Sequence, residues 1–196
     1  MPSGPAGVIG RSAHKALEHF YSGTSKELAI EKGLEYLRNV PDFEINFGKA
    51  TSKRAQKQKR ASMEKEYLQA IGFYLVRAPR YNVVGVEVSG MGNVGDLPLP
   101  VKAISDLVVE SKIEEGALDI VDHKFVDSFS TEAGDKPLFI LQALFNYYTV
   151  TEAYNMPVRR MIIQECKKRK NKDGKSQMRR YYIDFNELGE EYDLFY

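Results

Sequence analysis

The chain has 196 residues, of which 43% are hydrophobic and 28% are charged, and these proportions predict one folded globular domain over residues 1–196 rather than a disordered chain. Its single cysteine, Cys166, excludes intramolecular disulfides and cysteine-held iron–sulfur clusters and is typical of a cytoplasmic protein. No stretch is apolar over the roughly 18 residues that a membrane span requires, so we expect neither export nor membrane insertion.

The net charge of +1 conceals two strongly basic windows. Residues 49–60 carry six basic residues and no acid, and residues 167–180 carry eight basic residues and one acid. Half of the 28 basic residues therefore lie in two short segments, and the rest of the chain is acidic. Such windows are typical of solvated helix ends and hairpin tips, but two of them on an acidic body also fit a polyanionic partner.

Helices are expected in the first part of the chain, after a flexible start over residues 1–9. Apolar residues recur at helical spacing in three segments: residues 10–21, residues 26–37, and a long segment that Thr51 or Ser52 would cap and that runs to about Val76. The first turns of this long helix coincide with the first basic window.

Strands are expected in the second part, where β-branched residues are frequent. We predict them over residues 82–88, 101–109, 117–125, 158–166 and 177–185. The glycine- and proline-containing residues 89–100 predict a loop, and residues 169–175 predict the tip of a final hairpin inside the second basic window. Residues 137–154 predict a strongly apolar, largely buried helix. This order of elements predicts an α/β fold with a mixed central sheet flanked by helices.

Two of the predicted strands carry acidic residues between apolar neighbours. Side chains alternate along a strand, so Asp122 and Lys124 point to the same face of residues 117–125. If residues 101–109 pair with that strand, Asp106 joins them. A surface ion pair would explain such residues, but a carboxylate between apolar residues is costly unless a cation compensates it. Two carboxylates and an ammonium group suit Mg²⁺-dependent phosphodiester hydrolysis.

Four segments together resemble the RecB-type branch of the PD-(D/E)XK nucleases. They are G-R-S-A-H-K-A-L-E at residues 10–18, A-I-S-D-L-V-V at residues 103–109, L-D-I-V-D-H-K at residues 118–124, and a glutamine-initiated helical segment at Gln142. The resemblance runs from residue 10 to about residue 185. It implies a restriction-endonuclease-like core and nuclease activity, in a form without the iron–sulfur cluster that some relatives carry.

The resemblance also implies a role for individual residues. Those implied to hold Mg²⁺ or Mn²⁺ are His14, Asp106, Asp122 and the backbone carbonyl of His123. Lys124 is implied to support the attacking water, and Gln142 to help hold the site together. Relatives often place a tyrosine four residues after this glutamine, where the present chain has Asn146, so the tyrosine's role has no direct match.

Several residues keep a plain structural interpretation beside the functional one. A lone helical histidine such as His14 is more often a surface or packing residue, and only its motif favours a site role. Glu18, one turn later, either hydrogen-bonds the His14 ring or faces water. Glu87 lies between valines and stays open as a further ligand. Tyr181 and Tyr182 are expected to be sheet residues rather than stacking platforms for bases.

We therefore expect a Mg²⁺-dependent DNA exonuclease that leaves 5′-phosphates in recombination, repair or phage DNA processing. The basic windows 49–60 and 167–180 would hold the DNA backbone without sequence specificity, and recombination or helicase proteins are conceivable partners. The alternatives are a catalytically weak nucleic-acid-binding subunit and an endonuclease or RNA-directed enzyme of the same fold. Because relatives commonly have sequence ahead of the histidine helix, a compact viral form or a trimmed chain is expected.

Overall fold

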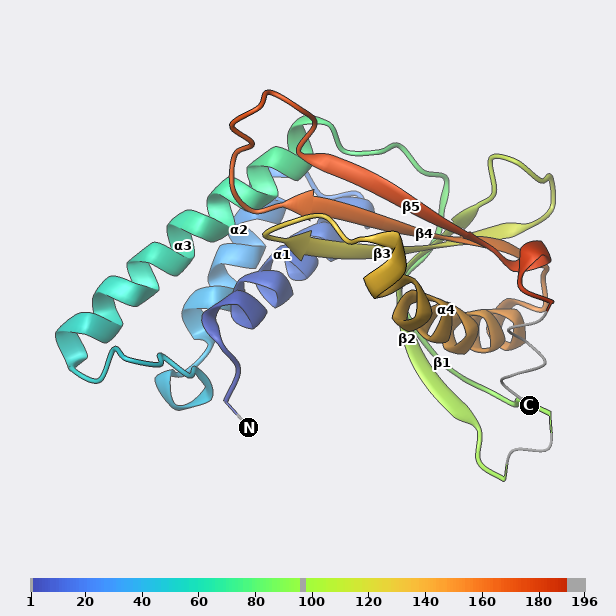
Figure 1. Cartoon of the computed structure of the whole chain (residues 1–196), viewed down its shortest axis with the longest axis horizontal. Helices are drawn as coiled ribbons and strands as arrows, with labels where there is room; N and C mark the ends of the chain where they lie inside the picture. The colour runs from blue at the N-terminus through green and yellow to red at the C-terminus, as the bar shows by residue number, and fades with distance from the viewer. Residues whose placement is uncertain (1, 96–97, 190–196) are drawn as a thin grey trace. The chain divides into compact units, whose positions relative to one another are not determined.

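The computed structural model describes residues 2–95 and 98–189, and this part of the chain contains a five-stranded sheet with flanking helices (Figure 1). In chain order the elements are α1 (Pro5–Tyr21), α2 (Lys26–Asn39), η1 (Asp42–Glu44), α3 (Lys53–Val76), β1 (Val83–Gly92), β2 (Val101–Glu110), β3 (Leu118–Val126), α4 (Glu132–Tyr154), β4 (Val158–Lys167), β5 (Met178–Asp184) and η2 (Phe185–Glu187). No described helix is both long and apolar enough to cross a membrane.

The sheet is mixed. Its strands lie in the order β1-β2-β3-β4-β5, and β1 and β3 both run antiparallel to β2. The arrows of β3 and β4, which α4 connects along the chain, point the same way in Figure 1. These features confirm the predicted α/β class with a restriction-endonuclease-like core.

The chain divides into two compact units. We call residues 2–78, 124–128 and 166–178 the helical unit, and residues 79–123, 129–165 and 179–189 the sheet unit. The division passes through three strands, because the last residues of β3 and β4 and the first residue of β5 belong to the helical unit.

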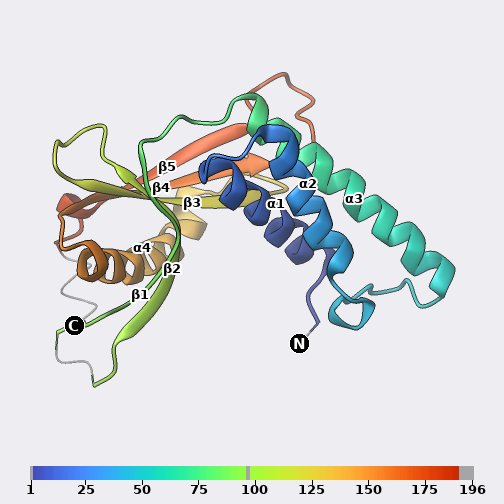
Figure 2. The ribbon, with the colours of Figure 1, turned by 180° about the vertical axis from the view of Figure 1, so that it is seen from behind.

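In the helical unit, α1 packs against α2 and α3, and the three helices can be followed from behind in Figure 2. Helix α1 begins at Pro5, five residues before the predicted start, because proline is well suited to a first helical turn. Gly33 lets α2 approach α1 closely, since a Cβ atom there would lie 2.6 Å from the carbonyl oxygen of Ser12. Helix α3 begins as predicted, with Ser52 accepting a hydrogen bond from the Ala55 N–H at 3.2 Å.

In the sheet unit, α4 packs against β1 and β2. The prediction of a loop from residue 89 was wrong, because β1 continues to Gly92. Its glycines face the helix: a Cβ atom at Gly90 would lie 3.1 Å from the Thr149 carbonyl oxygen, and one at Gly92 only 2.7 Å from the Tyr148 carbonyl carbon. The glycines that suggested a loop therefore permit a close helix–strand contact.

Helix α4 also differs from its prediction. It begins at Glu132 and contains Pro137, so Gln142 lies well inside the helix and does not initiate it. Leu138 and Leu141 are 66% and 43% exposed, although both were expected to be buried. The buried face of α4 instead consists of Phe139, Ala143, Leu144, Asn146, Thr149 and Val150. The buried face thus includes two polar residues, of which Asn146 accepts a hydrogen bond from Ser105 on β2 and Thr149 lies against Gly90 on β1.

The predicted final hairpin is present, and its tip lies in the helical unit. The Lys167 N–H donates to the Gln177 carbonyl at 2.9 Å. Asp173 accepts a hydrogen bond from the Lys175 N–H at 3.1 Å, and Gly174 between them has a φ of +70°. An Asp-Gly pair is suited to this geometry because glycine adopts positive φ without steric cost.

Candidate metal and catalytic site

The carboxylate of Asp106 lies against the backbone of β3. Strand β2 pairs with β3 from Leu107, which lies opposite Val121, so Asp106 and Asp122 stand just beyond the end of this pairing. Asp106 Oδ2 accepts a hydrogen bond from the His123 N–H at 2.7 Å. Asp106 is half-buried, whereas the His123 side chain is buried, with its Nδ1 at 3.7 Å from the same oxygen. The two strands predicted to carry the site are thus neighbours.

Glu87 lies beside Asp106 on the opposite side of β2. Val86 pairs with Leu107 and Val88 pairs with Ser105, which places Glu87 opposite Asp106. A carboxylate oxygen of Glu87 lies within 4.8 Å of one of Asp106. Two like charges at this separation repel each other unless a cation or proton compensates them.

The backbone of β1 is irregular at Glu87. This residue has a φ of +50°, a region that L residues with long side chains rarely adopt. Gly85 and Val88 both approach the α4 side of the sheet although they are three residues apart, so the alternation of β1 is interrupted between them. A strained residue whose carboxylate adjoins another carboxylate is a typical feature of a functional site.

Asp122 is connected to α4 by hydrogen bonds. Its Oδ1 accepts from Gln142 Nε2 at 2.6 Å, and the Gln142 carbonyl accepts from Asn146 Nδ2 at 2.9 Å. The Oδ1 atom of Asn146 accepts from Ser105 Oγ on β2 at 2.8 Å. Asn146, which stands where relatives often have tyrosine, therefore links the helix to the strand that carries Asp106.

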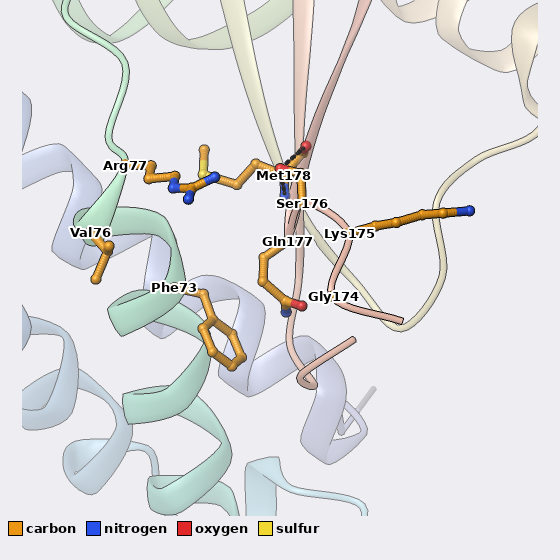
Figure 3. Close-up of a pocket in the computed structure, with 8 residues that line it drawn as sticks. All are labelled: Phe73, Val76, Arg77, Gly174, Lys175, Ser176, Gln177 and Met178. Atoms are coloured by element: carbon orange, nitrogen blue, oxygen red, sulfur yellow. Dashed lines mark hydrogen bonds between the residues drawn. The ribbon is translucent and has the colours of Figure 1, made fainter. Parts of the chain in front are cut away.

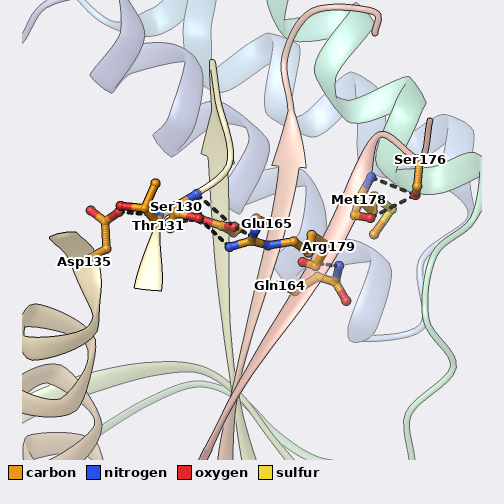
Figure 4. A network of polar contacts seen from close by, with 8 residues as sticks. All are labelled: Ser130, Thr131, Asp135, Gln164, Glu165, Ser176, Met178 and Arg179. Carbon is orange, nitrogen blue, oxygen red and sulfur yellow. Dashed lines mark hydrogen bonds and ion pairs between the residues drawn. The ribbon is translucent and has the colours of Figure 1, made fainter. Parts of the chain in front are cut away.

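The connection between β3 and α4 is fixed by a buried carboxylate, shown in Figure 4. Glu165 on β4 is 0% exposed and accepts hydrogen bonds from the Ser130 hydroxyl and from the Ser130 N–H, the latter at 3.1 Å. Arg179 Nε lies 3.5 Å from Glu165 Oε2, and Arg179 also donates to the Ser130 carbonyl at 2.5 Å. These contacts hold the segment that leads into the helix of Gln142.

Two of the predicted site residues belong to the helical unit. His14 is half-buried on α1, with its ring centroid 6.2 Å from that of Phe125. Glu18 is salt-bridged to Lys15 at 2.7 Å. Lys124 lies two residues after Asp122 on the uninterrupted strand β3, so strand alternation gives these two side chains the same face.

The basic windows are partly used by contacts within the protein. Arg60 donates to Asp42 at 2.6 Å and to the Leu37 carbonyl at 3.3 Å. In the second window, Lys168 is buried and lies 3.5 Å from Asp127. The side chains of these windows that are exposed belong to Lys49, Lys53, Arg54, Lys57, Lys59, Arg169, Lys170, Lys172, Lys175, Arg179 and Arg180.

A cavity of about 240 Å³ lies in the helical unit between the end of α3 and the second basic window (Figure 3). Phe73 and Val76 line it from α3, and Gln177 and Met178 line it from the hairpin. Lys175 also borders the cavity, but its side chain extends away from α3 in Figure 3. None of the eight lining residues is acidic, so this cavity lacks the carboxylates of a cation site.

The residues of the sheet unit fit a hard divalent cation. Mg²⁺ and Mn²⁺ prefer carboxylate oxygens, and Glu87 and Asp106 supply such oxygens from adjacent strands. Glu87 was left open by the sequence, because strand spacing alone does not show that β1 and β2 pair at this position. An acidic residue between valines was the only signal.

Comparison with known proteins identifies a family. The family model described as "PD-(D/E)XK nuclease superfamily" matches residues 2–192. The solved structure of SSO0001 matches with 15% sequence identity and a TM-score of 0.38, covering 100% of this chain and 76% of that chain. No curated protein matches the sequence.

Proposed function

Because the chain belongs to the PD-(D/E)XK nuclease superfamily, we propose that it is a metal-dependent deoxyribonuclease and that its two units form one catalytic domain. The observation that carries this proposal is the pair of carboxylates on adjacent strands, Glu87 and Asp106, within 4.8 Å of each other. A metal-dependent phosphodiesterase uses such a concentration of negative charge to bind the cation that polarises its substrate.

We assign the metal ligands partly from the family resemblance and partly from the contacts. The proposed ligands are His14, Glu87, Asp106, Asp122 and the backbone carbonyl of His123. An oxygen-rich set of this kind suits Mg²⁺ or Mn²⁺. When bound, the cation would supply Lewis acidity toward a phosphate oxygen and toward water.

The remaining residues act on the water and on the ligands. We propose that the Lys124 ammonium group orients the attacking water and stabilises the negative charge that develops on the phosphate. Gln142 holds one oxygen of Asp122, and the His123 N–H holds one oxygen of Asp106. The water oxygen would bond to phosphorus, the bond to O3′ would break, and the products would be a 5′-phosphate and a 3′-hydroxyl.

The finer assignment is a RecB-type exonuclease in recombination, repair or phage DNA processing. The motifs around His14 and Lys124 support it, and the one cysteine restricts it to the form without an iron–sulfur cluster. The exposed residues of windows 49–60 and 167–180 would neutralise DNA phosphates without reading bases.

The test is to incubate the protein with linear DNA, closed circular DNA or RNA, in Mg²⁺, Mn²⁺ or a chelator. We expect metal-dependent loss of linear DNA with 5′-phosphate ends. Asp106→Asn and Lys124→Ala should each lower the rate by about 10²-fold or more, because each removes charge from the reacting centre.

Matched control variants are Glu35→Gln and Lys32→Ala, which each remove one partner of a salt bridge on α2. Both should cut DNA at the unmodified rate. Nicking of closed circular DNA would indicate an endonuclease instead of an exonuclease. Cleavage of RNA alone would show that the substrate is RNA and not DNA. DNA binding without cleavage in any metal would contradict nuclease activity and support the alternative of a nucleic-acid-binding subunit.

A further inference from the structure

The two adjacent tyrosines of β5 have different surroundings. The Tyr181 ring packs in the core of the sheet unit, with its centroid 5.8 Å from that of Phe139. Tyr182 points to the other face and is 47% exposed. The guanidinium carbon of Arg160 lies 4.7 Å from the Tyr182 ring centroid. Tyr182 is therefore a surface aromatic ring that rests on an arginine rather than on the core.

Arg160 is held in place by a buried carboxylate. Its Nε donates to Asp119 Oδ2 at 2.9 Å, and Asp119 is only 1% exposed. Asp119 Oδ1 has no hydrogen-bond partner among the described residues. A buried ion pair contributes little to stability because desolvation offsets its attraction. Its effect here is to fix the guanidinium group beneath the Tyr182 ring.

More cationic side chains surround this pair. Arg180 Nε donates to Gln164 Oε1 at 3.0 Å, and the Lys112 ammonium lies 5.6 Å from the centroid of Tyr81. Burial raises the pKa of Tyr81 to about 12, and Arg180, Tyr182, Arg160 and Asp119 are near enough to modify the shift. We call Tyr81, Lys112, Arg160, Arg180 and Tyr182 the tyrosine–arginine strip.

The chemistry of the strip matches one class of ligand. It has three cationic side chains, Lys112, Arg160 and Arg180, of which Arg160 is paired with the carboxylate of Asp119, and these cations favour a polyanion. Its exposed aromatic ring favours a flat π-system, and single-stranded nucleic acid offers both phosphates and unstacked bases. In the interior of a duplex the bases are already stacked on one another, so an unpaired base reaches Tyr182 more readily than a paired one.

We propose that Tyr182, supported by Arg160, stacks on one unpaired base of single-stranded DNA, while Arg160 and Arg180 contact the adjacent phosphates. This inference rests on the proposed function, because it makes a single-stranded tail or frayed end the part of the DNA that the sheet unit binds. It gives the strip a role that neither Asp106 nor Lys124 has, which is selection of strand state rather than hydrolysis.

The test measures binding by the whole chain in a chelator, so that no cleavage occurs. Fluorescence anisotropy compares a labelled oligo-dT with a blunt duplex, and a 2-aminopurine strand reports stacking by quenching. Tyr182→Leu should weaken oligo-dT binding at least ~5-fold, remove most of the quenching and leave duplex binding unchanged. Tyr182→Phe keeps the ring and should restore both. Phe43→Leu, which replaces an aromatic residue that is 79% exposed, is the matched control and should have no effect.

A second measurement needs no variant. Ultraviolet crosslinking of a strand that contains 5-iodouracil to the unmodified protein should give an adduct at Tyr182. Oligo-dT binding that is unchanged in Tyr182→Leu, an equal loss on the duplex, or adducts only elsewhere would overturn the inference. Because binding is measured without metal, these outcomes are distinct from a failure to cut DNA in Mg²⁺, which would overturn the proposed function instead.

Discussion

Strands β1 and β4 of the sheet each present a glutamate, but they treat its charge in opposite ways. Glu165 on β4 is fully buried and is surrounded by donors from Ser130 and Arg179. Glu87 on β1 is exposed, has a positive φ and adjoins the carboxylate of Asp106. The first carboxylate is held by donors inside the fold, whereas the second stands beside another carboxylate at a backbone position that is costly for glutamate. A buried carboxylate surrounded by its donors, such as Glu165, indicates a structural role. A strained carboxylate beside another carboxylate, such as Glu87, indicates a functional role.

Removal of the β4 carboxylate should have the largest effect on stability. Glu165→Ala would leave the Ser130 N–H and hydroxyl without their acceptor and Arg179 without its ion-pair partner. We expect the free energy of unfolding of Glu165→Ala, measured by urea denaturation, to be about 3 kcal/mol lower than that of the unmodified protein. The matched control is Glu66→Ala, which removes a glutamate paired with the exposed Arg169 and should cost less than about 1 kcal/mol. If Glu165→Ala and Glu66→Ala lowered the free energy of unfolding equally, the structural role assigned to Glu165 would be contradicted.

A smaller loss is expected where α4 contacts β1. In Gly92→Ala the new Cβ atom would lie 2.7 Å from the Tyr148 carbonyl carbon, so the helix must shift. We expect a destabilisation of about 2 kcal/mol, again by urea denaturation. Gly72→Ala is the control, because a Cβ atom there meets nothing within 4 Å. If the Gly92→Ala protein were as stable as Gly72→Ala, β1 and α4 would be able to move apart at this contact without a measurable cost in stability.

Substitution of the strained Glu87 should raise the free energy of unfolding, whereas the two substitutions above lower it. Asparagine adopts positive φ more readily than glutamate. In a chelator, Glu87→Asn should therefore be more stable than the unmodified protein by about 0.5 kcal/mol. Glu87→Gln removes the charge but keeps the long side chain, so the difference between the two variants isolates the backbone strain.

Addition of Mg²⁺ sharpens this comparison. The unmodified protein should gain stability as the metal concentration rises, because binding to the folded state is linked to folding. Glu87→Asn should gain less. A decrease in stability for Glu87→Asn in chelator, or an equal gain with Mg²⁺, would contradict the role assigned to Glu87.

The smallest effect concerns the thiol on β4. Cys166 is 0% exposed, and burial raises its pKa to about 12. Because the folded-state pKa lies above that of an unfolded thiol, about 8.5, the contribution of this group to stability is complete below about pH 8.5. It is lost as the pH rises toward 12. At pH 8 the native thiol should react with a disulfide reagent far more slowly than in urea, and rapid labelling of the folded protein would contradict this expectation.

The fold was predictable from the sequence where a residue type or pattern is typical of a single local structure. Ser52 as the start of α3 and the alternation of β3 followed from capping and strand geometry. Glycine has two meanings, and at Gly90 and Gly92 it signals close packing against α4 rather than a loop. Leu138 and Leu141 are exposed because α4 turns a face with Asn146 and Thr149 toward the sheet, which composition alone does not indicate.

The candidate site was predictable to the level of strand pairing. Asp106 and Asp122 lie on antiparallel neighbours, and Gln142 donates a hydrogen bond to Asp122, while the roles that the resemblance implies for these residues stay predictions. The proximity of Glu87 to Asp106 depends on the register of β1 and on a positive φ, and the sequence carries no signal for either. The clamp of Glu165 on Ser130 joins residues 35 apart in the chain, and such contacts follow only from tertiary structure.

The burial of Cys166 has a practical consequence for spectroscopy. Since the native thiol is shielded and the chain has no other cysteine, a cysteine introduced at an exposed position becomes the one addressable attachment point. A fluorophore at Ser176, on the exposed hairpin tip, would report the arrival of a polyanion at the second basic window. The natural sequence needs no prior replacement for such an experiment.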